Sequence, residues 1–412
     1  MGQFRRLFGG NSQLHLLVAL VVVLVVIFQI FTGGKMLTSS NAQNMVIYNA
    51  HVLILSIGMV MVVVIGQLDL SVGSVAACVS MSVALIMASL GVPWWAGMII
   101  GLAFGALIGT WQGFWLAAVG IPGVIVTLAG MMIFRGIVLW ESHALSVSVP
   151  DAFRVLGAGY LPEWGPRWTQ VNNSTLLLGL LIVVWVAYTE GGRYRRRARL
   201  GRVEQERWSP ITRVVLTAVF VGGLVWLFGH GRMTTSFPVP GLVLVVLVIV
   251  YHVLTQRTAF GRHVYAVGGN PVAASLSGVN LRRVQFLVMV NMGVLAALAG
   301  MLFAGRSTAA GPQDGTYWEL DAIAAVFIGG AAVAGGMGTI GSAVMGGLVM
   351  AVLNNGLLLL GVGSDRTQVI KGLVLLIAVS FDLYSRRTGR FSIIGRLSTA
   401  FNPARNSLSR RD

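Results

Sequence analysis

Several residues of this 412-residue chain have types and spacings that could support chemistry, but their surroundings do not fit an active site. Gly336, Gly338 and Gly341 match the G-x-G-x-x-G pattern of dinucleotide-binding loops, yet no predicted strand precedes them and their context is apolar. The six histidines show no metal-ligand spacing, and the chain has no nucleophile-elbow serine and no G-x-x-x-x-G-K-[ST] loop for ATP. We therefore predict that the chain is not an enzyme and has no metal site and no cofactor.

Cys78 is the single cysteine, so neither an intrachain disulfide nor a cysteine metal cluster can form. It stands in an apolar run, and we interpret it as a small buried core residue.

Composition indicates a membrane protein that crosses the bilayer several times. Hydrophobic residues make up 56% of the chain, charged residues only 10%, and the mean hydropathy is +0.81. The net charge of +16 is concentrated in particular segments between apolar runs, as in the eight arginines between Arg193 and Arg213. Arginine-rich loops of this kind mark the cytosolic side of a membrane protein, so we do not expect nucleic acid as a partner.

The apolar runs predict an all-α polytopic bundle of about 12 spans with both termini in the cytosol, organised as one transmembrane domain over residues 1–412. The first run follows Arg5 and Arg6, is about as long as a full span and lacks a signal-peptide cleavage site, so we interpret it as a transmembrane helix. We divide the chain into eight spans over residues 14–254, a cytosolic segment over 255–285, four spans over 286–383 and a basic cytosolic tail over 384–412.

The fourth predicted span carries glycines at strict four-residue spacing: Gly101, Gly105, Gly109 and Gly113. Residues four apart lie on one stripe of a helix, and glycines there allow the backbone of a second helix to approach closely. This stripe predicts tight helix packing and says nothing about a substrate.

A polar segment rich in glycine, asparagine and serine, Gly261 to Asn280, lies between apolar runs and is flanked by arginines. The unpaired backbone groups of an irregular loop cannot lie in hydrocarbon, so we expect this segment in water, on the arginine-rich cytosolic side. We predict that a soluble partner binds there.

Two short stretches resemble each other. Residues 69–74 (DLSVGS) and 337–342 (MGTIGS) both stand where one apolar helix gives way to the next. Interrupted helices at matching places in two halves of a transporter often mark a translocation path, although a six-residue match in a chain with 53 glycines is equally consistent with chance.

Five stretches together resemble the permease subunits of ribose- and xylose-type ABC sugar importers. They are GQLDLSVGS from Gly66, residues 121–136, the segment that starts at Phe260, residues 319–330 and NNGLLLLGV from Asn354. The similarity covers nearly the whole chain in order. Two departures are Gln67 and Leu68, where the family pattern reads GG-I-D, and the extra pair of spans over residues 175–228, which resembles the xylose-type members.

This resemblance implies a permease homodimer in the cytoplasmic membrane of a bacterium, driven by a separate cytosolic ABC ATPase and supplied by an extracytoplasmic sugar-binding protein. The polar segment then matches the family's coupling segment, with a short helix over about Pro271 to Ser277 that docks into the ATPase. The residues expected to serve this coupling are Gly268, Gly269, Asn270, Pro271, Ala273, Ala274, Ser277 and Gly278. Sugar transport by alternating access follows, with a pentose slightly favoured over a hexose.

A neutral sugar needs hydroxyl and amide groups along its path, and Thr127, Asn354 and Asn355 are candidates, with interhelical hydrogen bonding as the alternative. Asp69 is a fourth candidate, and capping of the following helix or interfacial solvation are its alternatives. Arg135 could extend to an interface. Glu319, Asp321 and Asp365 are expected to face the outside, where they either meet basic residues of a binding protein or are ordinary outer-loop charge.

An ion- or proton-coupled secondary transporter is the alternative from another class, since it would also show about twelve spans. Such carriers usually need ionisable residues deep in the membrane, and the predicted spans contain almost none. Uptake without any ATPase would favour that alternative.

Overall fold

The computed structural model describes residues 12–166, 169–199, 208–230, 235–332 and 334–387. Arg5, Arg6 and residues 388–412 of the predicted tail lie outside the described residues, so the position of both termini stays a prediction. The chain divides into two compact units, residues 1–362 and residues 363–412.

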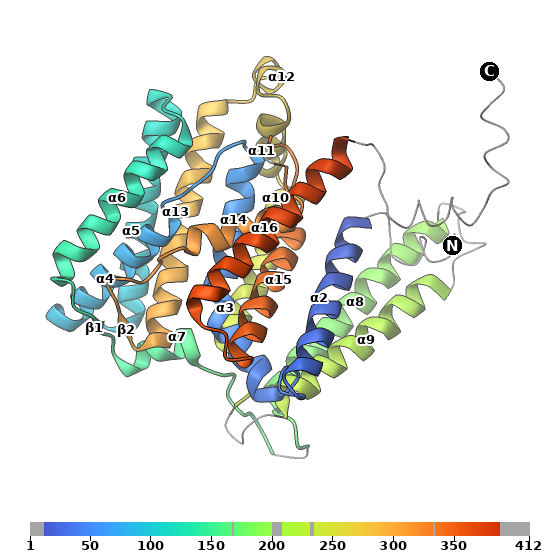
Figure 1. Ribbon diagram of the computed structural model, residues 1–412. Helices are drawn as coiled ribbons and strands as arrows, with labels where there is room; N and C mark the ends of the chain where they lie inside the picture. Colours follow the sequence, from blue (N-terminus) through green and yellow to red (C-terminus); the bar gives the residue numbers. More distant parts are fainter. Residues whose placement is uncertain (1–11, 167–168, 200–207, 231–234, 333, 388–412) are drawn as a thin grey trace, which may run out of the picture. The chain divides into compact units, whose positions relative to one another are not determined.

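The first unit is almost entirely helical (Figure 1), which confirms the all-α class. Its α-helices are α2 (Ser12–Phe31), α3 (Ser39–Val64), α4 (Val72–Leu90), α5 (Trp94–Phe114), α6 (Gly123–Ser142), α7 (Arg154–Ala158), α8 (Asn173–Arg199), α9 (Trp208–Gly229), α10 (Val239–Arg257), α11 (Ala259–Gly269), α12 (Pro271–Leu276), α13 (Leu281–Ser307), α14 (Trp318–Ile328) and α15 (Ile340–Leu359). A π-helical turn, Trp115–Val119, ends α5, and a 3₁₀ turn, Asp151–Phe153, precedes α7.

The second unit consists, in its described part, of helix α16 (Ser364–Arg387).

Within the described residues, nine helices are long and apolar enough to cross a membrane: α3, α4, α5 with its π-helical turn, α6, α8, α9, α10, α13 and α15. The apolar part of α2, Leu16–Phe31, is shorter. Helix α14 has only 11 residues, a rise of about 16 Å that covers roughly half of the hydrocarbon core. All twelve predicted spans therefore correspond to helices, while the count of twelve complete crossings stays a prediction.

Helix α13 lies at the centre of the first unit. It packs against α3, α4 and α5, and its side chains Val288, Met292 and Ala297 have almost no exposed surface. Glycine permits the closest approaches: a methyl group on Gly293 of α13 would lie 2.2 Å from the carbonyl oxygen of Gly105, and one on Gly300 would lie 2.1 Å from that of Ala76. These helices therefore contact one another through their backbones.

One end of the first unit carries α12 and the opposite end carries a two-stranded antiparallel sheet (Figure 1). Strand β1 (Val147–Ser148) pairs with β2 (Ala309–Ala310), with Val147 opposite Ala310. The sheet joins the link that follows α6 to the link that follows α13. We call these two regions the α12 end and the sheet end.

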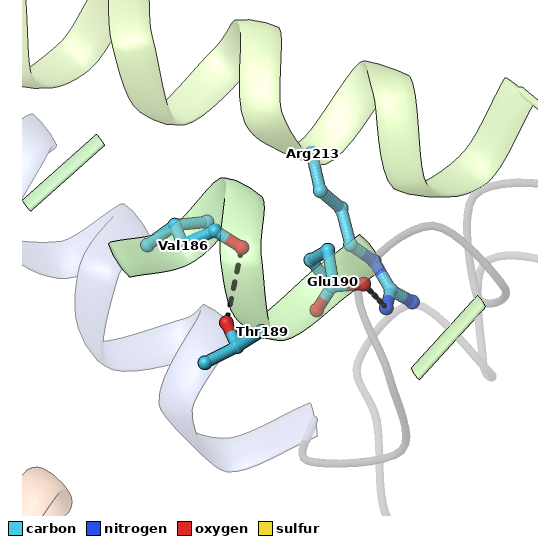
Figure 2. Close-up of polar contacts among 4 residues, drawn as sticks. All are labelled: Val186, Thr189, Glu190 and Arg213. Atoms are coloured by element: carbon cyan, nitrogen blue, oxygen red, sulfur yellow. Dashed lines mark hydrogen bonds and ion pairs between the residues drawn. The ribbon is translucent and has the colours of Figure 1, made fainter. Parts of the chain in front are cut away.

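Helices α8 and α9 form an antiparallel hairpin, and they correspond to the extra pair of predicted spans. Helix α8 continues past the predicted end of the sixth span at Tyr188 and includes arginines up to Arg199, because arginine is a good helix former and need not end a helix that leaves the membrane. Figure 2 shows an ion pair between the helices, in which Arg213 Nη1 lies 3.4 Å from Glu190 Oε2.

The polar segment predicted as an irregular loop is mostly helical. Helix α11 begins after Thr258, whose hydroxyl accepts the Gly261 N–H, and α12 begins after Asn270, whose side chain accepts the Ala273 N–H. Hydrogen bonds within these two helices pair most of their backbone groups, and each capping side chain accepts one further N–H. The prediction that this segment lies in water rested on unpaired backbone groups of an irregular loop, and that premise was wrong.

Candidate functional site

Asp69 is buried in the extended link between α3 and α4, where it is only 2% exposed. Its Oδ1 accepts the Ser71 N–H at 2.8 Å and the Ser71 hydroxyl at 2.6 Å, and Gln112 Nε2 of α5 donates to the Ser71 hydroxyl at 2.6 Å. Of the three interpretations of Asp69, these contacts favour the one in which the carboxylate organises the first turn of α4. Burial excludes an interfacial, solvated carboxylate.

The same link contacts the first turn of α6. Thr127 is fully buried, and its hydroxyl lies 3.3 Å from the carbonyl oxygens of both Leu68 and Val124. Gln67 Oε1 accepts the Gly123 N–H at 3.0 Å. Gln67 is one of the departures from the family pattern, and here it satisfies a backbone donor at the start of a helix that has no earlier carbonyl to bind.

Glu319 does not belong to an outer loop. A methyl group built on Gly73 would lie 2.6 Å from Glu319 Oε2 and 2.0 Å from the Gly315 carbonyl oxygen, so the start of α14 and the link before it lie against the first turn of α4. Asp69 is close enough to Glu319 for their charges to interact. The structure thus places two carboxylates from distant parts of the sequence at one junction.

Arg135 of α6 binds the backbone of a neighbouring link. Its Nη1 donates to the carbonyl oxygens of Pro312 and Asp314, at 3.0 and 2.7 Å, and so holds the link between β2 and α14. Asp314 in turn accepts the Gly311 N–H through Oδ2 at 2.8 Å. Arg135 and Asp314 thus provide hydrogen-bond partners for backbone groups of this non-helical link.

Asn354 and Asn355 lie on α15, which packs against α2, and thus in contacts that differ from those of Asp69 and Thr127. Asn355 is buried, and its amide lies 3.5 Å from the sulfur of Met36. The Oδ1 atom of Asn354 is buried with no hydrogen-bond partner among the described residues. The four path candidates therefore do not form one group.

The glycine stripe of α5 faces α13. Methyl groups on Gly105 and Gly109 would lie 2.5 Å from the Gly293 carbonyl oxygen and 2.6 Å from that of Met289. One on Gly101 would meet the Met301 sulfur at 2.4 Å, and one on Gly113 would meet the Phe286 ring at 3.0 Å. Gly105 and Gly109 thus lie against the backbone of α13 at a separation too small for any side chain, whereas Gly101 and Gly113 first meet side chains of α13.

Helix α12, Pro271–Leu276, lies where the family resemblance implied a short helix. Six of the eight candidate coupling residues are exposed, while Ala274 is buried and Gly268 is half-buried. Gly278 has a φ of +83°, so it ends α12 in the left-handed region that glycine adopts without strain. Exposed apolar side chains sit on this helix at i and i+4, with Val272 69% and Leu276 86% exposed.

Gly268 connects this segment to the rest of the unit. A methyl group on Gly268 would lie 1.6 Å from the Val64 carbonyl oxygen at the end of α3, and that oxygen accepts the Gly336 N–H at 2.8 Å. The Tyr265 hydroxyl of α11 donates to the Gly338 carbonyl oxygen at 2.6 Å, and burial raises the pKa of Tyr265, so it remains a neutral donor. We call Val64, Tyr265, Gly268, Gly336 and Gly338 the backbone junction.

Sequence reasoning missed two groups. Gln112 carried no signal beyond being an amide in an apolar run, which in a membrane helix could have been noticed. The second group is an aromatic cluster at the sheet end: Tyr48, His51, Phe303, Arg306 and Trp318. Its members come from α3, α13 and α14 and share no sequence motif.

Comparison with known proteins decides the family. The family model described as the permease component of the branched-chain amino acid transport system matches residues 41–379. The chain belongs to this family of transport permeases. It is therefore a multi-pass membrane protein and one component of a larger transport system, and it is not an enzyme.

Individual relatives agree with the resemblance read from the motifs, which is confirmed. The chain is 36% identical to the xylose transport system permease protein XylH of Escherichia coli strain K12 over 388 residues, 94% of this chain and 95% of that protein. It is 36% identical to XylH of Haemophilus influenzae over 380 residues, 92% of this chain and 98% of that protein. The ribose import permease protein RbsC of Bacillus subtilis is 32% identical over 329 residues, 80% of each chain. No solved structure matches the chain.

Proposed function

We propose that this chain is the permease subunit of an ATP-driven importer for a pentose such as xylose or ribose, in the cytoplasmic membrane of a bacterium. The names of the relatives, the extra hairpin α8–α9 and the coverage of nearly the full chain support a xylose-type substrate. Two copies of the chain form the path, a cytosolic ABC ATPase drives it, and an extracytoplasmic binding protein delivers the sugar.

Helix α12 is the observation that carries this proposal. This six-residue helix packs against α11 and α13 and buries Ala274, while Val272 and Leu276 remain exposed. Apolar side chains one helical turn apart on an exposed helix are the usual anchors for a groove in another protein. We assign this groove to the ATPase, and α12 is then the coupling helix.

The backbone junction can transmit a movement of the coupling helix to the membrane-spanning helices. Movement of α11 and α12 acts on the end of α3 and on the turn between α14 and α15, because Gly268 touches Val64 and Tyr265 binds Gly338. No flexible side chain lies between Gly268 and Val64, so a displacement of one backbone requires a displacement of the other. Alternating access then consists of a shift of α3, α14 and α15 driven from the α12 end.

The docking proposal is tested by co-purification of the detergent-solubilised permease with its candidate ATPase. Leu276→Arg, combined with Val272→Arg, is expected to abolish capture of the ATPase, because two charges replace the apolar anchors. Ala259→Arg, at the exposed first residue of α11, is the matched control and should bind normally.

Equal binding by both variants would place the docking site elsewhere. Sugar uptake by the wild type in liposomes that contain no ATPase would instead contradict an ABC importer and favour the secondary transporter.

Two neighbouring glycines test the junction. A methyl group on Gly268 meets the Val64 carbonyl, whereas one on Gly269 meets nothing within 4 Å. Gly268→Ala is expected to lower sugar uptake roughly 10-fold or more, since the backbones must separate and overpacking costs about 1–3 kcal/mol. Gly269→Ala should stay close to wild type. Uptake by the two variants in reconstituted complexes is compared, and equal values would exclude this route of coupling.

A further inference from the structure

The aromatic cluster surrounds one guanidinium group. The Cζ atom of Arg306, in the last turn of α13, lies 4.4 Å from the ring centre of Phe303 and 4.9 Å from that of Tyr48 on α3. Both distances are within the range of cation–π contacts. Arg306 is thus held between two aromatic rings from different helices.

A second layer supports these rings. The ring centre of His51 lies 4.2 Å from that of Trp318 and 5.1 Å from that of Phe303, and Phe303 and Trp318 are 4.7 Å apart. His51 and Trp318 are each only 8% exposed. The rigid packing of this layer fixes the position of Phe303, and thereby of Arg306.

Exposure is uneven across the cluster. Tyr48 is 46% exposed, although it stands on the helix whose apolar stretch is 89% buried. Asn44, one turn earlier on the same face of α3, is also exposed, and Arg306 is partly exposed. The ring of Tyr48 and the guanidinium group of Arg306 are therefore accessible to a ligand on this side of α3.

This combination matches the chemistry of a monosaccharide. One face of a sugar ring carries several C–H groups, which pack on an aromatic ring. The sugar hydroxyl groups accept hydrogen bonds from a guanidinium group, and they both donate hydrogen bonds to an amide and accept them from it. A neutral ligand leaves the Arg306 charge in place, and the adjacent Asp314 charge offsets it. The acyl chain of a lipid carries no hydrogen-bond acceptor for the guanidinium group.

We propose that Tyr48 and Arg306, supported by Phe303, His51 and Trp318, form a contact site for the sugar at the sheet end of the permease path. This proposal rests on the proposed function and adds residues that act on the sugar itself. Tyr48 supplies the stacking surface and Arg306 supplies hydrogen-bond donors. The site lies at the opposite end of the unit from α12, where a binding protein would release the sugar.

Uptake by the complete complex tests the site. The permease, ATPase and sugar-loaded binding protein are reconstituted in liposomes, and xylose uptake and ATP hydrolysis are measured together. Tyr48→Ala is expected to lower uptake about 3- to 10-fold through loss of one aromatic contact, while ATP hydrolysis continues. Tyr48→Trp keeps a ring and should retain most of the uptake. Tyr188→Ala removes a tyrosine that is 78% exposed on α8 and should change neither rate.

Each outcome separates the possibilities. Wild-type uptake with an unchanged Tyr48→Ala variant would overturn the sugar site and leave the proposed function intact. Absence of ATP-dependent pentose uptake by the wild type would overturn the proposed function itself. Equal loss of uptake in Tyr48→Ala and Tyr48→Trp would show that the hydroxyl or the local fold, rather than stacking, is required, and would also reject the site.

Thiol protection provides a measurement that does not depend on turnover. Cys78 is buried and is the only cysteine, so Cys78→Ala gives a cysteine-free background. In that background, Tyr48→Cys should react with a polar thiol reagent more slowly, by about threefold, when the complex holds xylose, because an occupied site excludes the reagent. Leu145→Cys, 68% exposed after α6, is the control and should react equally with and without sugar. Equal reaction of Tyr48→Cys in both states would contradict the proposal.

Discussion

Helices α3 and α13 and the hairpin α8–α9 are similarly apolar, yet they occupy opposite environments. Of the apolar stretches, 89% of α3 and 61% of α13 are buried, compared with 17% of α8 and 11% of α9. Helices α3 and α13 take part in the backbone contacts and in the aromatic cluster, whereas the hairpin exposes large side chains such as Leu180, Trp185 and Phe220.

The difference teaches that hydropathy identifies a membrane helix but not its neighbours. In lipid, apolar surface gains little by leaving the acyl chains, so close packing depends on small residues and internal polar contacts. Helix α13 has both, whereas Gly222 and Gly223 of α9 have no atom within 4 Å of an added methyl group. A glycine in an apolar run is therefore a packing residue only if a second helix lies against it.

The largest expected effect comes from adding the same methyl group to both regions. Gly109→Ala places a Cβ 2.6 Å from the Met289 carbonyl oxygen and should destabilise the protein by about 3 kcal/mol or more, because the backbones of α5 and α13 must move apart. Gly222→Ala has open space and should be neutral or stabilising by up to about 1 kcal/mol through helix propensity. Thermal unfolding in detergent measures both, and equal shifts of the midpoint would remove the contrast between the two regions.

An intermediate effect is expected at the buried carboxylate. Asp69→Ala leaves the N–H and hydroxyl of Ser71 without their acceptor and should cost about 1–3 kcal/mol. Asp69→Asn keeps an acceptor oxygen and should cost less. Unfolding of the two variants is compared with that of wild type. A loss of uptake in Asp69→Asn with full stability would instead favour direct contact of Asp69 with the sugar.

The smallest effect is expected at the ion pair of the hairpin. Arg213→Gln removes the charge of one partner of a pair at 3.4 Å, in which the Arg213 side chain is 29% and the Glu190 side chain 10% exposed. The change should cost about 0.5–1 kcal/mol, because glutamine can still donate a hydrogen bond to Glu190. A loss well above that range, measured by the same thermal unfolding, would mean that the hairpin is held as tightly as the buried helices.

The sequence predicted the helices and their class well, because long apolar runs and arginine-rich turns directly reflect the bilayer. It also located the glycine stripe, and the resemblance placed the short helix at Pro271. Helix α8 continues beyond the predicted span into the arginines, because the end of an apolar run marks the end of a span and not the end of a helix.

Contacts between residues that are distant in the sequence could not be predicted from it. Glu319 and Asp69 are 250 positions apart, and only the fold brings both to the start of α4. The partners of Arg135 are backbone carbonyl groups, which no pattern of side chains in the sequence could reveal. The aromatic cluster likewise combines single residues from three helices.

The short helix α14 has a consequence for how the protein is assembled. Its 11 residues include Glu319 and Asp321 in the first turn, so its hydropathy alone should not be sufficient for insertion into the membrane. Its place is set by α3, α4 and α15, together with the Arg135 hydrogen bonds to the link before it. We therefore expect α14 to enter last, after its neighbours have formed, and variants that weaken this junction to be recognised by cellular quality control before transport is affected.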